Sequence, residues 1–131
     1  MNWLRRYSDG IYSAMRFMAG FLFACHGLQK YFGVLGGSAQ IHTVKGMVAG
    51  TIEMIGGTLI AVGLAASVAA FISSGEMAVA YFWVHARRDF WPIINKGELA
   101  IVFCFLFLYI AAKGSGKYSL DTAFKRGGPG A

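Results

Sequence analysis

Charged residues are scarce in this sequence. They make up 14% of its 131 residues, and only six are acidic, against twelve lysines and arginines. Hydrophobic residues account for 56%. A water-soluble domain of this size needs more polar side chains to cover its surface. The shortage excludes an ordinary soluble protein and predicts a chain that lies in a lipid bilayer.

Histidine and cysteine are also few, which limits metal and thiol chemistry. Cys25 and Cys104 stand far apart without a C-x-x-C motif, and isolated cysteines in apolar segments are more often buried small residues than redox pairs. No histidine pair with a spacing of four and no Glu-x-x-His motif occurs. We expect no metal site. His26 and His85 as axial ligands of a haem are the alternative that these two residues leave open.

Basic runs with interleaved aromatic residues, which are typical of nucleic-acid-binding chains, are absent as well. The formal net charge of +6 fits basic side chains that lie beside anionic lipid head groups. Membrane lipids are therefore expected partners, and nucleic acid is not.

What the sequence has in abundance is long apolar segments. A bilayer span takes roughly 20 apolar residues, and four segments qualify, at 9–30, 46–64, 67–86 and 97–112. Between the second and the third, the glycine and serine of Gly63–Ser67 give the only turn signal. We predict an all-α integral membrane protein: one membrane domain over residues 1–131, a bundle of four transmembrane helices with both termini on the same side, and a flexible C-terminal tail at 122–131. Basic residues are balanced between the two sides, so charge alone does not decide the orientation.

Ionisable residues within or at the ends of these spans are the candidates for function. A charge at the bilayer centre costs about 2.5–3.5 kcal/mol, and such residues usually face the interior of a bundle. Helical spacing places Glu53 on one face with glycines and an alanine, and places Arg16 and Lys30 on a second face that also carries glycines, with His26 at its flank. Small residues let helices approach closely, so both faces are expected to contact protein. The two stripes are Gly46, Gly50, Glu53, Gly57 and Ala61, and Arg16, Gly20, Phe23, Gly27 and Lys30.

The expected depth of each residue follows from the alternating direction of the helices. Five residues are expected near the face opposite the termini: His26, Lys30, Glu53, His85 and Glu98. Arg16 lies about 10 Å from Glu53 along the axis at about 1.5 Å per residue, so a direct pair needs a long reach. Glu76 lies near mid-membrane. His85 follows it by nine residues and falls on the opposite side of the same helix, which disfavours a common site.

The order of these segments resembles a known family. The runs "RFMAGFLFACHGLQKYFG", "IEMIGGTLIAVGL", "KGELAIVFCFLFLYIAA" and "GSGKYSLD" are similar, in sequence and spacing, to the DoxX family of small four-helix bacterial membrane proteins. The resemblance implies cytoplasmic termini in the bacterial cell (inner) membrane. It also implies that recurrent family positions correspond to Arg16, His26, Gly27, Lys30, Glu53, Gly57, Glu98 and the triplet Ser119, Leu120, Asp121. It does not extend to Glu76 or His85.

What the resemblance implies about function is a membrane redox-associated subunit, because the founding members resemble a subunit of a thiosulfate:quinone oxidoreductase. Three interpretations of the polar residues remain open. They form a quinone or other ligand site, with His26 and Glu53 or Glu98 exchanging protons. They form a buried network that fixes helix register. Or the carboxylates Glu98, Glu53 and Glu76 relay protons. Quinone is the cofactor expected if there is one. The alternative to a quinone-linked subunit is a non-catalytic accessory subunit that packs against a larger membrane complex.

Overall fold

The computed structural model describes residues 1–126, whose regular secondary structure is entirely helical, with no strand among them. The elements in chain order are α1 (Asn2–Arg5), α2 (Ser8–Phe32), α3 (Val44–Thr51), η1 (Ile52–Gly56), α4 (Gly57–Val62), α5 (Ala66–Ala80), η2 (Tyr81–His85), α6 (Pro92–Asn95), α7 (Glu98–Lys113) and α8 (Leu120–Arg126). η1 is a π-helical turn inside an otherwise α-helical rod, and η2 is a π-helical turn at the C-terminal end of the rod that begins with α5. The prediction of an all-α fold is confirmed.

Three helical rods are long and apolar enough to cross a membrane: Ser8–Phe32, Val44–Val62 and Ala66–His85. They correspond to the first three expected spans. The fourth, α7, has 16 residues and falls short of the length of a typical span. The turn between the second and third rods lies where the glycine signalled it, because Gly63 and Ala65 both adopt left-handed backbone conformations, with φ of 73° and 48°.

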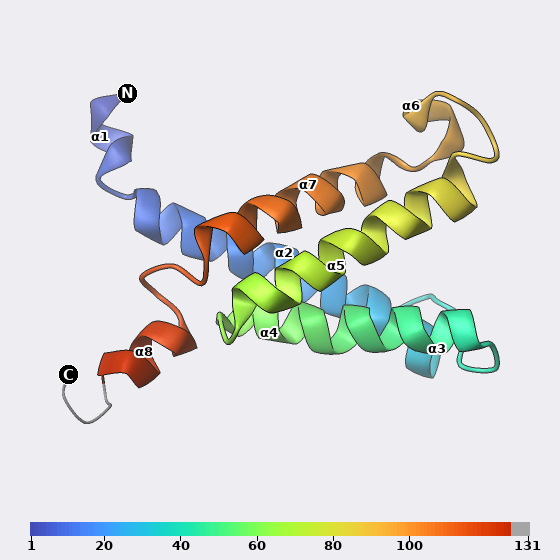
Figure 1. Cartoon of the computed structure of the whole chain (residues 1–131), viewed down its shortest axis with the longest axis horizontal. Coiled ribbons are helices and arrows are strands. Elements are labelled where there is room, and N and C mark those ends of the chain that lie inside the picture. Colours follow the sequence, from blue (N-terminus) through green and yellow to red (C-terminus); the bar gives the residue numbers. More distant parts are fainter. Residues whose placement is uncertain (127–131) are drawn as a thin grey trace.

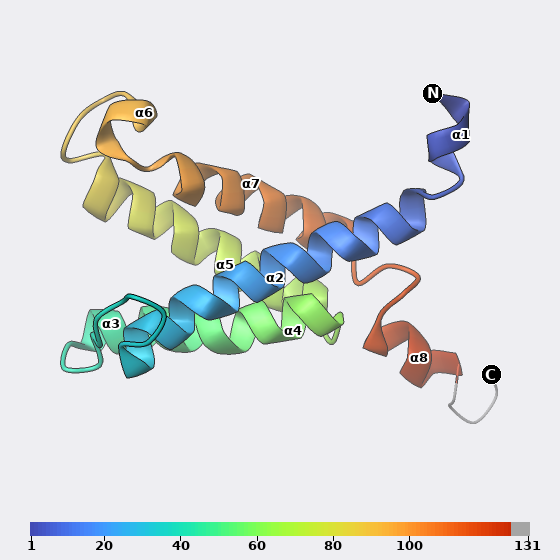
Figure 2. The ribbon, with the colours of Figure 1, turned by 180° about the vertical axis from the view of Figure 1, so that it is seen from behind.

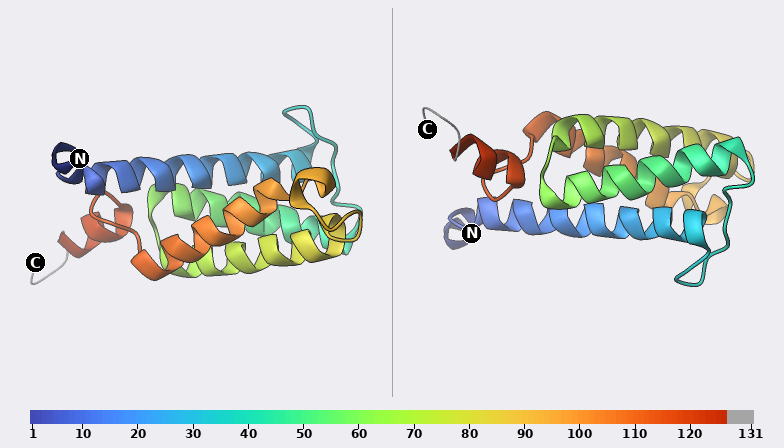
Figure 3. Two further views of the ribbon diagram at one scale, coloured as in Figure 1. Left: turned by 90° about the horizontal axis from the view of Figure 1, so that it is seen from above. Right: turned by 90° about the horizontal axis from the view of Figure 1, so that it is seen from below.

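The rods pack as two pairs that cross each other. α2 lies along the rod made by α3, η1 and α4, and α5 lies along α7 (Figure 1; Figure 2). Figure 3 shows α1 and α8 at one end of the array and α6 with the loop before α3 at the other. The tail expected at 122–131 overlaps α8 over residues 122–126, and the rest of it lies outside the described residues.

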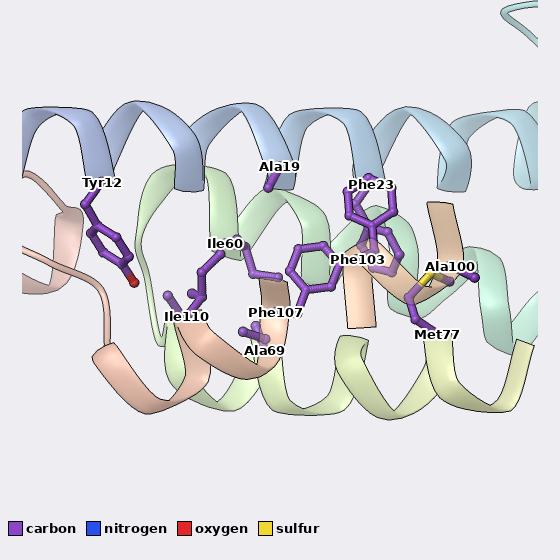
Figure 4. Packing of buried hydrophobic residues seen from close by; sticks show 12 residues of the cluster. Tyr12, Ala19, Phe23, Ile60, Ala69, Met77, Ala100, Phe103, Phe107 and Ile110 are labelled. Carbon is purple, nitrogen blue, oxygen red and sulfur yellow. The ribbon is translucent and has the colours of Figure 1, made fainter. Parts of the chain in front are cut away.

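Aromatic side chains from α2 and α7 fill the centre (Figure 4). Phe23 packs edge-on against Phe107 with 4.7 Å between ring centroids, and Phe107 stacks on Phe103 at 5.2 Å. Such pairs add about 0.5–1.5 kcal/mol beyond the burial of their area. α2 therefore makes two kinds of contact. Glycines bring its backbone close to that of α4, and aromatic rings fill the space between it and α7.

Candidate functional site

The polar centre of the molecule is an ion pair between α2 and η1. Lys30, in the last turn of α2, places its Nζ 2.5 Å from Oε1 of Glu53. Glu53 is only 2% exposed, and its second oxygen, Oε2, is buried with no hydrogen-bond partner among the described residues. A lysine at a helix C-terminus also interacts favourably with the helix dipole. The pair therefore holds a carboxylate inside the bundle and leaves one of its oxygens free.

An inner cavity of about 280 Å³ opens beside this pair. Its walls come from α2, η1, α5, η2 and α7, and they combine the rings of Phe23 and Phe103 with cationic and imidazole side chains. The lining residues are Phe23, His26, Lys30, Glu53, Met77, Ala80, His85, Lys96, Leu99, Ala100 and Phe103. His26 stands edge-on to Phe103 at 6.4 Å between centroids and forms no hydrogen bond within residues 1–126. The cavity thus offers an apolar slot with polar groups at its rim.

An outer cavity of about 660 Å³ lies next to the inner one and shares Lys30, Ala80 and His85 with it. Its other polar lining residues are Gln40, Thr43, Lys45, Glu76 and Trp83. Gln40 and Thr43 belong to the loop before α3, so this cavity reaches the end of the array that is opposite α1 and α8 (Figure 3).

His85 and Glu76 both line the outer cavity, although nine residues of α-helix would put them on opposite sides. The reason is η2, whose i→i+5 bonding takes about one more residue per turn than an α-helix and sets later side chains back by about 100°. Helical spacing alone disfavoured a common site, but both side chains line the same cavity. A lone π turn leaves no mark in the residue pattern.

Asn95 is a site residue that the sequence did not reveal. It is 1% exposed, and its backbone carbonyl lies 3.0 Å from Nδ1 of His85. Its side chain donates to Tyr81 Oη at 3.3 Å and to the Asp89 carbonyl at 3.0 Å, and accepts from the Gly97 amide at 2.8 Å. Asn95 therefore fixes the connection between η2 and α7, and with it the orientation of the His85 ring.

Arg16 forms a second polar centre, near the end of the array that carries α1 and α8. It is 2% exposed and donates through Nη1 to the carbonyls of Ile60 and Ala61, at 2.5 and 2.6 Å, and through Nη2 to the Tyr118 carbonyl at 2.8 Å. The first two carbonyls belong to the last turn of α4, where helical carbonyls lack their usual amide partner four residues further along. Arg16 thus caps α4 and does not join Lys30 and Glu53.

The triplet Ser119, Leu120, Asp121 belongs to this second centre. The Asp121 carboxylate accepts from the Ala65 amide at 2.9 Å and from Ser115 Oγ at 2.5 Å, and its amide donates to the Gly63 carbonyl at 3.1 Å. Ser119 Oγ accepts from the Thr122 amide at 3.2 Å and so caps α8, which begins at the half-exposed Leu120. The triplet fastens α8 to the turn between α4 and α5.

Glu98 stands apart from both centres. It occupies the first turn of α7, is exposed, and lines neither the inner nor the outer cavity. The expectation that it completes a network with Glu53 is not met by this arrangement. The helix dipole alone explains a glutamate at this position, because a carboxylate in the first turn of a helix interacts favourably with it.

Asp121 makes the attachment of α8 dependent on pH. The hydrogen bond from Ser115, followed by that from the Ala65 amide, lowers the pKa of Asp121 below its ordinary value. A lowered pKa in the folded state means that the stabilisation is complete above the ordinary aspartate pKa, about 3.9, and is lost as the pH falls through the lowered value. We expect Asp121→Asn at pH 7 to raise hydrogen exchange at the Ala65 amide about tenfold, since a hydrogen bond to a charged group contributes about 1.5–3 kcal/mol.

Hydrogen exchange with mass spectrometry in lipid nanodiscs measures this effect. Asp89→Asn is the matched control, because Asp89 also accepts from a backbone amide, that of Trp91 at 2.9 Å, but in the connection before α6. Unchanged exchange at Ala65 in Asp121→Asn would contradict the role of this carboxylate.

Comparison with known proteins agrees with the sequence resemblance. A model of the DoxX family matches residues 11–86, more than half of the chain. A protein of Haemophilus influenzae Rd, described as uncharacterized, is 37% identical over an alignment of 131 positions that covers 95% of this chain and 98% of that relative. No solved structure matches the chain. With its apolar helical rods and this match over the segment that holds Arg16, Lys30 and Glu53, the chain belongs to the DoxX family of membrane proteins.

Proposed function

We propose that this protein is a small subunit of a quinone-linked redox complex and that its inner cavity binds the quinone head group. The observation that carries the proposal is the Lys30–Glu53 pair, whose buried and unpartnered Oε2 atom lies beside a cavity walled by Phe23 and Phe103. A polar group without a partner is costly in a membrane interior. A ligand that supplies a hydrogen-bond partner there removes that cost.

The chemistry of a quinone fits the lining of this cavity. A quinone ring is flat and apolar, so it suits the two phenylalanine rings, and its two oxygens need hydrogen-bond donors, which His26 and Lys30 supply. Reduction takes up two electrons and two protons, and Glu53 is a group that can exchange a proton with a bound ligand. At about 280 Å³ the cavity lies just below the usual range for ligand sites, roughly 300–1,000 Å³, which suits a head group whose isoprenoid tail remains in the lipid.

The membrane arrangement is part of the proposal. We place α7 as a fourth span beside the three longer rods, because it is apolar and packs along α5. α1 and α8 lie at the same end of the array, which supports termini on one side (Figure 3). With the family resemblance, this favours cytoplasmic ends in a bacterial cell (inner) membrane, and puts the outer cavity toward the periplasmic side.

In this proposal the electrons come from a partner subunit that carries a redox cofactor. The described chain holds no group of three or more potential metal-ligating side chains. Aromatic residues on α5, η2 and α7 point outward, with Phe71, Phe82 and Phe105 exposed by 66–67%. Lipid covers such side chains in part, and they also offer contacts to a larger membrane subunit that carries the cofactor. The same exposed residues support the alternative function, that of an accessory subunit without a ligand.

Quinone binding is tested by purifying the protein in mild detergent, extracting and identifying any quinone, and titrating the protein with a short-chain ubiquinone analogue. We expect His26→Leu to raise the Kd about tenfold, because one lost hydrogen bond of about 1.4 kcal/mol corresponds to that factor. His42→Leu is the matched control, since His42 lies exposed in the loop before α3. Absence of binding by the unaltered protein would overturn the proposal in favour of the accessory role.

A further inference from the structure

Glu76 is an intramembrane carboxyl group that the quinone site does not use. It lies in α5, in the middle of the rod Ala66–His85, and faces the outer cavity. Its Oε2 atom is buried and has no hydrogen-bond partner among the described residues. No cation of those residues lies within 4 Å of its oxygens, since the ion pair of the described chain is Lys30–Glu53.

The charges around Glu76 leave it without a counter-ion. Lys30 on α2 is bonded to Glu53 on η1, and Lys45 on α3 places its Nζ over the Trp83 ring, 5.9 Å from the centroid. His85 on η2 has its Nδ1 atom occupied by the Asn95 carbonyl. An unpaired charge inside a membrane is costly, whereas a neutral carboxyl group costs much less. With one lysine for two buried glutamates, we expect Glu53 to be charged and Glu76 to be protonated.

The outer cavity connects this carboxyl group in two directions. Toward the end of the array it is lined by Gln40, Thr43 and Lys45, polar residues of the loop and of the start of α3. Toward the interior it shares Lys30 and His85 with the inner cavity. Glu76 thus lies between the membrane surface and the ion pair.

We propose that the outer cavity is the proton-supply route to the quinone site, with Glu76 as the group that holds the exchangeable proton. This inference rests on the quinone site proposed above. In each step Lys30 gives a proton to the ligand, which takes its electrons from the cofactor-bearing partner. The Glu76 carboxyl group then returns a proton to the lysine amine, and the resulting Glu76 carboxylate takes one from water in the outer cavity. Each quinone reduced requires two such transfers.

Infrared spectroscopy of the full-length protein in lipid vesicles tests the protonation of Glu76 without any quinone. A protonated carboxyl group has a C=O stretching band that a carboxylate lacks. We expect that band at pH 7 in the unaltered protein and its loss in Glu76→Gln. Glu98→Gln is the matched control, because Glu98 is exposed and lines neither cavity. A band that survives Glu76→Gln overturns the proposal.

The route itself is tested by transfer into D₂O, which shifts the same band as the proton exchanges. Ala49→Phe fills the outer cavity from α3 and should slow the shift at least tenfold. Should this variant fail to fold, Val44→Trp makes the same test from the exposed rim of the cavity. Exchange as fast in the filled cavity as in the open one overturns the route.

The link to quinone is tested by electrochemical reduction of the bound ubiquinone analogue, where the electrode replaces the partner. Glu76→Gln should slow reduction at least tenfold and leave the Kd of the analogue unchanged, whereas Glu98→Gln should alter neither. The two proposals fail separately. No binding of the analogue to the unaltered protein overturns the quinone site. Binding together with an unchanged reduction rate in Glu76→Gln overturns the proton route alone.

Discussion

Replacing Gly57 with alanine is expected to lower the free energy of unfolding by about 2–3 kcal/mol, because one added methyl group overfills the contact between α2 and α4. A Cβ atom at Gly57 would lie 2.5 Å from the Ala24 amide nitrogen and 2.6 Å from the Gly20 carbonyl oxygen. Both are backbone atoms, which cannot turn aside as a flexible side chain can. The two helices would have to separate along their whole contact.

The matched control is Gly75→Ala on α5, where an added Cβ atom meets nothing within 4 Å. There the substitution only replaces glycine by a better helix former and should raise stability by up to about 1 kcal/mol. Reversible unfolding in mixed detergent micelles, followed by circular dichroism, measures both variants. Equal effects at the two positions would mean that close packing of α2 on α4 does not stabilise the fold.

This contact is the part of the fold that the sequence predicts best. Gly20, Gly27 and Gly57 fall on two helical stripes that also carry Lys30 and Glu53, and the structure packs these stripes against each other. The prediction succeeds because helical period and residue size are local properties. Small residues and an intramembrane charge on one face indicate a protein contact wherever the neighbouring helix comes from.

Two features of the site depend on information that is not local. The π turn η2 rotates His85 into both cavities, and no residue pattern marks where such a turn occurs. The sequence grouped Arg16 with the other ionisable residues because it shares a glycine-rich helical face with Lys30. Its actual partners are backbone carbonyls, including that of Tyr118, which is 102 residues away in the chain. Every residue carries a backbone carbonyl, so the residue types do not indicate which carbonyls Arg16 will bind.

Replacing Lys30 with methionine is expected to lower the free energy of unfolding by about 3–5 kcal/mol, since it leaves the Glu53 charge buried without its partner. Glu53 is 2% exposed and no other hydrogen-bond donor among the described residues reaches its oxygens, so it has no alternative partner. A second substitution should restore the lost stability. The double variant Lys30→Met/Glu53→Gln removes the charge together with its partner and should recover stability to within about 1 kcal/mol of the unaltered protein.

The same unfolding measurement distinguishes this explanation from a general sensitivity to loss of positive charge. Lys45→Met removes a lysine from the wall of the outer cavity, but Lys45 is exposed and has no carboxylate partner among the described residues. It should change stability by no more than about 0.5 kcal/mol. A double variant as unstable as Lys30→Met would show that the lysine acts through its packing. A full rescue would show that the Lys30–Glu53 pair adds nothing net to stability. A charged pair that neutral residues can replace without loss is not needed by the fold, which favours another use for the Glu53 charge, and here its second oxygen lies beside the inner cavity.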